Sequence, residues 1–199
     1  MKIEINPMEK ASLVTEVIRN RRTIFADAFT SEEVSQELIE QVLTDAIWAP
    51  THKRTEPWRF VVLKGNHPEK MGEYMAEFYK DYILEKRYNS LKQYCKNATL
   101  IAIIMHRDER ERIPEWEELA AVSCAVQNLW LSCTTHGLGG YWETCEAAME
   151  YTKQFTQAGE RSMGIFMLGH YDAVTTKAVS RRRPLEEKLH WDFGDELTD

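Results

Sequence analysis

The chain has 199 residues, of which 43% are hydrophobic and 29% charged, and its formal net charge is −7. These values fit one globular domain spanning residues 1–199 and exclude a disordered or collagen-like chain. The negative charge argues against general nucleic-acid binding, which requires an extended basic surface. We therefore expect a single folded domain with no nucleic-acid partner.

Apolar runs and cysteines bear on where the protein resides. No apolar run reaches the roughly 20 residues of a membrane-spanning helix, and the first residues contain no apolar secretion signal. The four cysteines form no CxxC pair, and Cys124 and Cys133 fall within an apolar helical run, where cysteine behaves as a small hydrophobic residue. This usage is typical of a reducing compartment. The sequence predicts a cytoplasmic protein with no membrane partner.

Two helices are predicted before residue 50. The first runs from Asn6–Pro7, a cap followed by proline, to about Arg22. The second begins after the candidate cap Ser35 and extends to Trp48. The first helix is expected to bury one face, because four apolar residues recur at helical spacing: Leu13, Val14, Val17 and Ile18.

Strands and helices are then predicted in turn. Strands are expected at 58–64, 98–105 and 163–171, and the second is so continuously apolar that it should be covered on both faces. Helices are expected over about 67–92, from Pro114 to Cys133, and over 147–156. The helix after Pro114 is apolar around most of its circumference, which predicts that other elements or a second subunit enclose it.

Cationic and glycine-rich segments are the candidates for chemistry. There is no zinc motif, serine elbow or Walker loop, and the glycines after residue 136 follow a helix rather than open one. Guanidinium groups suit phosphate, and adjacent glycines let a backbone approach a flat ligand. The segments are Arg21–Thr23, His52–Arg54 in a turn stiffened by Pro50 and Pro57, Gly139–Thr144, and Arg181–Arg183. Spacing alone leaves two interpretations open, a shared site for a phosphate-bearing ligand and scattered surface charge.

The same segments, in this order, resemble the nitroreductase family of FMN-dependent NAD(P)H oxidoreductases, and in particular its YdjA-like branch. The resemblance rests on Arg21-Arg22-Thr23, the Ala-Pro and Glu-Pro-Trp-Arg-Phe block at 49–60, Gly-Leu-Gly-Gly-Tyr-Trp at 137–142, and Gly-His-Tyr at 169–171. It implies an α+β fold, a three-layer sandwich with a mostly antiparallel sheet flanked by helices. It also implies an intertwined homodimer with FMN at the subunit interface.

The resemblance further implies a set of cofactor contacts. Arg21, Thr23 and one tail arginine, with Arg182 the first choice, would contact the FMN phosphate and ribityl chain. Residues 142–144 would pass along the flavin ring, with one backbone N–H at N5, and His52 would reach the cofactor of the other subunit. The predicted cofactor-binding residues are Arg21, Arg22, Thr23, His52, Arg54, Trp142, Glu143, Thr144 and Arg182. No metal site is expected, and the flavin itself would carry the chemistry.

Three residues depart from the family pattern. Phe25 stands where many members carry a basic residue near flavin N1 and O2, Arg54 replaces a common asparagine, and Glu56 replaces a common glutamine. A reduced flavin held as an anion needs a nearby donor or cation. Our hypothesis is that Arg54 or Lys53 supplies the charge that Phe25 cannot.

The resemblance implies ping-pong hydride transfer from NAD(P)H through flavin N5 to a flat acceptor such as a nitroaromatic or quinone. Two alternatives remain at this point. One is a non-catalytic flavin-binding sensor or storage protein, and the other is reduction of an enone or a halogenated substrate, because a fold does not fix the substrate.

Overall fold

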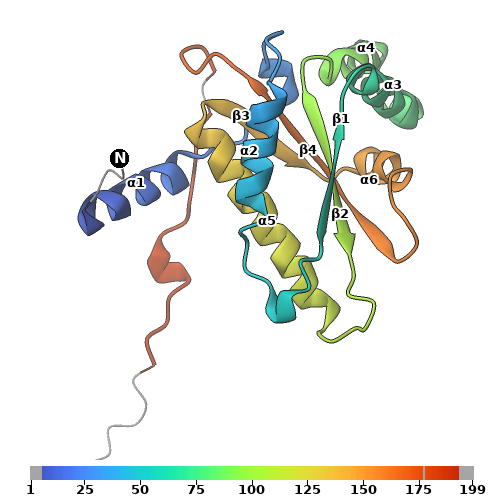
Figure 1. Cartoon of the computed structure of the whole chain (residues 1–199). Coiled ribbons are helices and arrows are strands. Elements are labelled where there is room, and N and C mark those ends of the chain that lie inside the picture. The colour runs from blue at the N-terminus through green and yellow to red at the C-terminus, as the bar shows by residue number, and fades with distance from the viewer. Residues whose placement is uncertain (1–5, 177, 193–199) are drawn as a thin grey trace, which may run out of the picture.

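The computed structural model describes residues 6–176 and 178–192. In this part of the chain a four-stranded antiparallel sheet, in the order β1-β2-β4-β3, lies between two layers of helices (Figure 1). The strands are β1 (Trp58–Leu63), β2 (Thr99–His106), β3 (Leu138–Glu143) and β4 (Glu160–His170). The helices are α1 (Pro7–Asn20), α2 (Gln36–Ala46), α3 (His67–Tyr79), α4 (Glu85–Tyr94), α5 (Glu115–Thr135) and α6 (Glu146–Lys153). The α+β sandwich implied by the resemblance is confirmed.

The two faces of the sheet carry separate cores. Helices α2 and α5 pack on one face, against Ile101, Ile103 and Phe166. Helices α3, α4 and α6 pack on the other, against Leu100, Ala102 and their neighbours. Strand β2 is therefore covered on both sides, as its continuous apolar run predicts.

Local sequence signals explain where the helices begin and end. The Ser35 hydroxyl accepts a hydrogen bond from the Leu38 N–H at 3.2 Å and caps α2 as predicted. At α1, the Asn6 side chain accepts from the Glu9 N–H at 3.0 Å, and the Glu9 carboxylate accepts from the Asn6 N–H. Gly137, in a left-handed conformation with φ 70°, follows the last turn of α5.

The prediction that α1 buries its apolar face is wrong for the single chain. Helix α1 projects from the body of the molecule (Figure 1), and none of its residues, all of which the structure describes, is buried. Leu13, Val14 and Ile18 are each at least half exposed. Helical periodicity identifies an apolar face, but it does not tell which chain covers that face. Helix α1 also ends at Asn20, two residues before its predicted end.

The glycine-rich segment after α5 forms an edge strand, β3, which the sequence analysis did not predict. A Cβ atom at Gly139 would lie 2.9 Å from the Ile24 Cγ2, and one at Gly140 would lie 2.9 Å from the Phe166 ring. These glycines therefore make room for side chains of the same chain. The Ile24 N–H donates to the Gly140 carbonyl at 3.2 Å, so the segment after α1 runs along this edge of the sheet.

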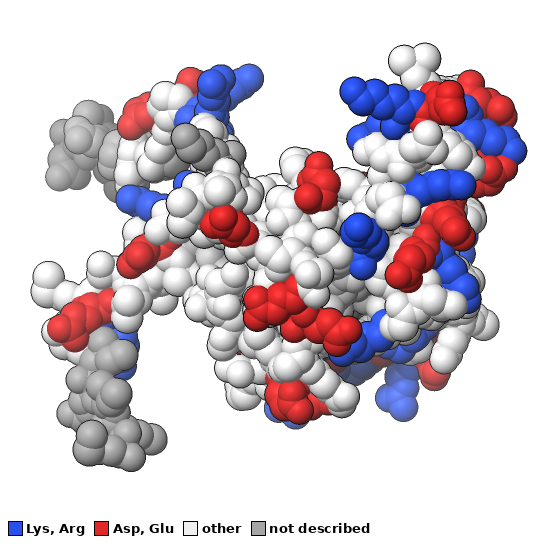
Figure 2. All heavy atoms as spheres, turned by 90° about the horizontal axis from the view of Figure 1, so that it is seen from above, with Lys and Arg blue, Asp and Glu red and all other residues white. Residues whose placement is uncertain are grey.

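On the face of the molecule shown in Figure 2, basic and acidic side chains are interspersed, so neither sign of charge dominates that face. Among the described residues, no helix combines the length and hydropathy that a membrane span requires.

An ion pair joins Arg59, near the start of β1, to Glu160, the first residue of β4. The Arg59 Nε donates to the Glu160 Oε1 at 2.6 Å, and its Nη2 donates to the other carboxylate oxygen and to the Phe155 carbonyl. The Glu160 side chain is only 1% exposed. Removing Arg59 would leave the Glu160 carboxylate with only the Gln157 N–H, at 2.7 Å, and His106, at 3.4 Å, as partners. We therefore expect Arg59→Met to lower the free energy of unfolding by about 2 kcal/mol, measured by urea titration. Arg161→Met, which breaks an exposed pair with Glu115, should cost less than about 1 kcal/mol. Equal losses would contradict this assignment.

The Arg59–Glu160 pair also determines the direction in which folding stability changes with pH. The hydrogen bond from Arg59 holds the pKa of Glu160 below its ordinary value of 4.5. A carboxyl group whose pKa is lower in the folded state stabilises the fold above its unfolded pKa, and this contribution is lost as the pH falls through the folded pKa. Between pH 7 and pH 3, the wild type should therefore lose stability more steeply than Arg59→Met.

Candidate functional site

Two of the predicted binding segments, Arg21–Thr23 and Arg181–Arg183, contribute residues to one hollow, which we call the arginine pocket. It has a volume of about 470 Å³ and lies between the end of α1, the segment that follows it, and the tail. Its polar wall contains Arg21, Arg22, Thr23 and Arg182, and Phe25 contributes an aromatic side. Residues far apart in the sequence are thus brought together as the resemblance implies.

One hydrogen-bond donor of the Arg21 side chain has no partner in this pocket. Its Nη1 is buried and has no hydrogen-bond partner among the residues that the structure describes. The guanidinium lies 4.2 Å from the centre of the Trp130 ring of α5, which holds it by a cation–π contact. Burial lowers the pKa of Arg21, and the nearby charges of Arg182 and Arg22 lower it further. An anion in the pocket would relieve both the missing hydrogen bond and the mutual repulsion.

Arg22 differs from Arg21 in its contacts. Its Nη1 turns back to the Arg19 and Arg21 carbonyls, at 2.6 and 2.9 Å, and so satisfies the C-terminal end of α1. Arg182 is exposed and donates to the Arg181 carbonyl at 2.8 Å. Of the three arginines, Arg21 therefore has the strongest physical requirement for a ligand.

An aromatic contact links the arginine pocket to β3. The Phe25 ring meets the Tyr141 ring edge-on, with centroids 5.2 Å apart. The Tyr141 hydroxyl donates to the Tyr94 hydroxyl at 2.8 Å, and burial raises the pKa of Tyr94 to about 12. The Glu143 charge further along β3 contributes to that rise. Both the Tyr94–Tyr141 pair and its position beside Phe25 were missed by the sequence analysis, since the residues lie far apart in the chain.

The predicted residues at the end of β3 are held by the protein itself. The Trp142 Nε1 donates to the Met163 carbonyl at 2.7 Å, and the ring packs in the core under α5. The Glu143 carboxylate accepts from the Cys145 N–H at 2.9 Å, which supports the start of α6. Thr144 is exposed. These contacts fix the direction of the backbone where the strand leaves the sheet.

His52 and Arg54 do not join the arginine pocket of their own chain. Their turn lies beside the first turns of α5 (Figure 1), whereas Trp130 marks the other end of that helix. Residues 117 and 130 of α5 are about 20 Å apart along the helix axis. The His52 Nδ1 lies 2.6 Å from the Glu117 Oε2, and Lys53 donates to the Arg112 carbonyl at 2.9 Å. The turn is stiffened by left-handed residues as well as by its prolines, since Lys53, Arg54 and Glu56 all have positive φ.

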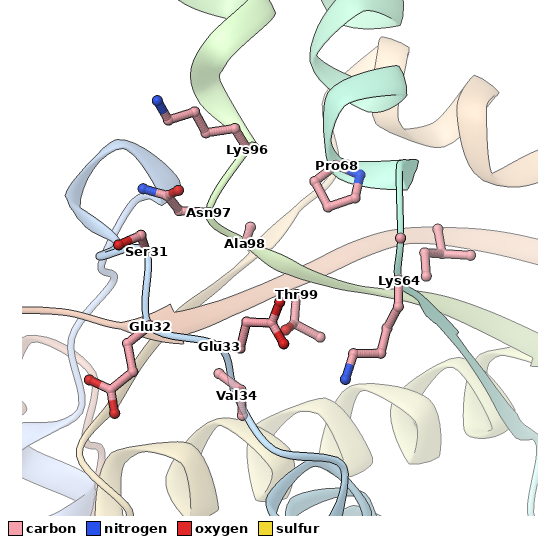
Figure 3. A pocket seen from close by; sticks show the side chains of 12 residues that line it. Ser31, Glu32, Glu33, Val34, Lys64, Pro68, Lys96, Asn97, Ala98 and Thr99 are labelled. Carbon is pink, nitrogen blue, oxygen red and sulfur yellow. The ribbon is translucent and has the colours of Figure 1, made fainter.

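A second hollow, of about 170 Å³, opens between the end of β1 and the start of β2 (Figure 3). Glu33 and Lys64 give it both charges, and the Lys96 amine points away from it. The Asn97 amide already donates to the Phe29 carbonyl at 2.9 Å. None of the predicted binding residues lies here, so the arginine pocket remains the candidate site.

The fold is an α+β sandwich, and its arginine pocket contains a buried Arg21 donor that has no partner among the described residues. The model of the family described as "Nitroreductase family" matches residues 18–170. The chain belongs to this family, which confirms the resemblance.

Individual relatives agree with this assignment. The chain is 28% identical over 188 residues to a protein of Bacillus subtilis named "Putative NAD(P)H nitroreductase YfhC", covering 89% of this chain and 93% of that protein. It is 25% identical over 134 residues to YdjA of Escherichia coli K12, covering 65% and 70%. Among solved structures, a nitroreductase-like family protein from Bacillus cereus superposes with a TM-score of 0.77 at 26% identity, covering 98% of this chain and all of that one. A Desulfovibrio desulfuricans protein described as a "putative nitroreductase in complex with fmn" has a TM-score of 0.68 at 26% identity, covering 95% of this chain and 98% of that one.

Proposed function

We propose that the protein is an FMN-dependent NAD(P)H oxidoreductase that reduces a flat acceptor such as a nitroaromatic or a quinone. Family membership supports an oxidoreductase. The FMN complex of the Desulfovibrio relative and the name of the Bacillus subtilis relative support the cofactor and the electron donor. The structural observation that carries the proposal is the buried Arg21 Nη1 without a partner.

The residues present fit FMN. A phosphate accepts several hydrogen bonds, and its negative charge suits a lining that contains three arginines and one carboxylate, that of Asp27. Arg21, Thr23 and Arg182 would hold the phosphate, and Phe25 would lie beside the ring system. Residues 142–144, at the end of β3 and just beyond it, would guide the flavin ring, as the family pattern implies. His52 and Arg54 would have to act on the cofactor of a second subunit, because their own pocket is at the opposite end of α5.

FMN, when bound, accepts a hydride from NAD(P)H and passes it to the acceptor. The protein binds, orients and shields the reactants. Burial raises the pKa values of Tyr94 and Cys95 to about 12, so neither side chain exchanges a proton near neutral pH. The residues around β3 therefore act through position and hydrogen bonding.

We also propose a homodimer. Apolar residues of α1 and Leu131 of α5 line one hollow of about 280 Å³, and Trp116, at the other end of α5, is 67% exposed. Trp48, at the end of α2, is 81% exposed. Monomeric proteins rarely leave apolar patches of this extent uncovered. A two-fold pair that joins these faces would bury α1 and bring the His52 turn of one chain to the arginine pocket of the other.

The proposal predicts that the protein binds flavin, and is therefore yellow, and that it catalyses repeated turnovers. Purified protein reconstituted with FMN should show flavin absorbance after gel filtration, and should oxidise NADH or NADPH steadily when a nitroaromatic or quinone is added. A sensor or storage protein would bind flavin without turnover. Failure to retain FMN under these conditions would reject the assignment. A cytoplasmic location is part of the same proposal, and fractionation of the host cell tests it.

A further inference from the structure

A histidine–carboxylate pair stands at the edge of an apolar hollow. The His52 Nδ1 and the Glu117 Oε2 are 2.6 Å apart, and the histidine side chain is 56% exposed. The hollow beside them has a volume of about 430 Å³ and is lined by Pro50, Trp116 and Cys124. The pair joins the turn at residues 52–54 to the first turn of α5 and leaves the imidazole partly exposed at the surface.

The pair fixes the roles of the two ring nitrogens. A carboxylate accepts hydrogen bonds, so the Nδ1–H of His52 donates to Glu117, and Nε2 remains to serve another group. A proton donor carries its proton on the nitrogen that faces the acceptor, so donation from Nε2 uses the imidazolium form of the ring. Histidine ordinarily exchanges a proton between pH 5 and 8, which suits it to proton transfer.

Neighbouring charges are engaged elsewhere. Lys53, on the same turn, donates to the Arg112 carbonyl, and Arg112 is paired with Asp108 at 2.8 Å. Arg54 is exposed on the turn. From α5, Glu117 is the charged group that bonds to His52, and Cys124 lines the hollow one turn beyond Ala120. Among these charged groups, the Glu117 carboxylate is therefore the one in direct contact with the His52 ring.

Two-fold packing of α5 against α5 of a second subunit would bring the His52–Glu117 pair close to the arginine pocket of that subunit. Glu117 and Leu131 lie about 21 Å apart along α5. The outward stripe of this helix consists of Trp116, Ala120, Ser123, Gln127 and Leu131. Helices packed antiparallel along this stripe would place the first turn of one opposite the last turns of the other. His52 of the partner subunit would then approach the Trp130 end, where the arginine pocket and β3 lie.

We propose that His52 is the proton donor to the acceptor bound over the cofactor of the partner subunit, and that Glu117 is its positioning residue. This inference rests on the proposed function and deepens it. Reducing a quinone to a hydroquinone requires two electrons and two protons. The hydride brings both electrons and one proton. The second proton passes from the His52 Nε2 to a quinone oxygen as the O–H bond forms, and solvent then reprotonates the ring.

The test separates the two half-reactions of the FMN-loaded protein in a stopped-flow instrument. Reduction by NADH needs no proton from His52, whereas reoxidation by 1,4-benzoquinone does. We expect Glu117→Gln to slow reoxidation about tenfold and His52→Gln by about 100-fold, the range for loss of a general acid or of its orienting carboxylate. The matched control is Glu115→Gln, which removes the same charge from the same helical turn but a different partner, Arg161.

Two readouts distinguish proton donation from a structural role. The reoxidation rate of the wild type should fall as the pH rises from 6 to 9, and this dependence should disappear in His52→Gln. The ring ¹⁵N chemical shifts of His52, followed in the FMN-loaded protein, should show a protonated Nδ1 at high pH. This tautomer preference should weaken in Glu117→Gln and persist in Glu115→Gln.

The experiments distinguish a failure of the proton-donation proposal from a failure of the proposed function. Reoxidation of Glu117→Gln and His52→Gln as fast as that of Glu115→Gln, in protein that binds FMN normally, would overturn the proton donation and leave the proposed function standing. Equal slowing of both half-reactions would assign His52 to cofactor binding instead. A wild type that binds no FMN would overturn the proposed function and this inference with it.

Discussion

Replacing Arg21 by alanine should weaken FMN binding by about 10- to 100-fold, because a hydrogen-bonded charge pair contributes about 1.5–3 kcal/mol. Arg21 is the residue whose buried donor lacks a partner and whose charge is crowded by Arg22 and Arg182. Quenching of flavin fluorescence on titration with protein measures the dissociation constant. Arg21→Lys should recover only part of the affinity, since an ammonium lacks the planar fork and the stacking on Trp130.

The control ligand is riboflavin, which lacks the phosphate. Its affinity should be lower in the wild type and nearly unchanged by Arg21→Ala. The control variant is Arg22→Ala, for which we expect a smaller loss of FMN affinity, because the Arg22 guanidinium is already bonded to carbonyls of its own helix. An equal loss for FMN and riboflavin would show that Arg21 supports the fold of the pocket rather than the phosphate.

The second large effect concerns assembly. Val14 of α1 is 59% exposed in the single chain, so Val14→Asp should leave the fold of the subunit intact. In a two-fold interface the substitution buries two unpaired carboxylates, each costing about 3–5 kcal/mol, which is enough to dissociate the dimer at micromolar concentration. Sedimentation velocity measures the mass of the particle in solution. We expect a dimer for the wild type and a monomer with native circular dichroism for the variant.

Val174→Asp provides the matched control. Val174 is 86% exposed in the loop after β4, and the substitution introduces the same charge away from α1 and α5. This variant should remain dimeric. A Val14→Asp protein that sediments as a dimer, or a wild type that sediments as a monomer, would reject the proposed interface.

Much of the fold could be predicted because its signals are local. The cap at Ser35, the buried strand β2 and the stop at Gly137 depend on residues a few positions apart. Strand β3 was not predicted, since Gly139 and Gly140 are poor strand formers and are retained for the close approach of Ile24 and Phe166. The α1 face was assigned correctly as apolar and wrongly as buried.

The site was only partly accessible from the sequence. Arg21, Thr23 and Arg182 were found through the family resemblance, and the structure brings them together. Glu117, the partner of His52, lies 65 residues away from it, and nothing local distinguishes it from its acidic neighbours. The Tyr94–Tyr141 pair is likewise a long-range contact. Whether Lys53 or Arg54 compensates for Phe25 remains a prediction, with Lys53 held in its own chain by Arg112.

Arg21 directly follows the last residue of α1 and is at the same time a wall of the arginine pocket. Its guanidinium, stacked on Trp130, fastens α1 to α5, and α1 carries much of the uncovered apolar face. In the proposed dimer, binding at the pocket and association of subunits would both depend on the position of α1. If cofactor binding strengthens association, thermodynamic reciprocity requires that association strengthen binding by the same factor. The apparent affinity for FMN should therefore rise with protein concentration, and cofactor-free subunits should exchange partners more readily than loaded ones.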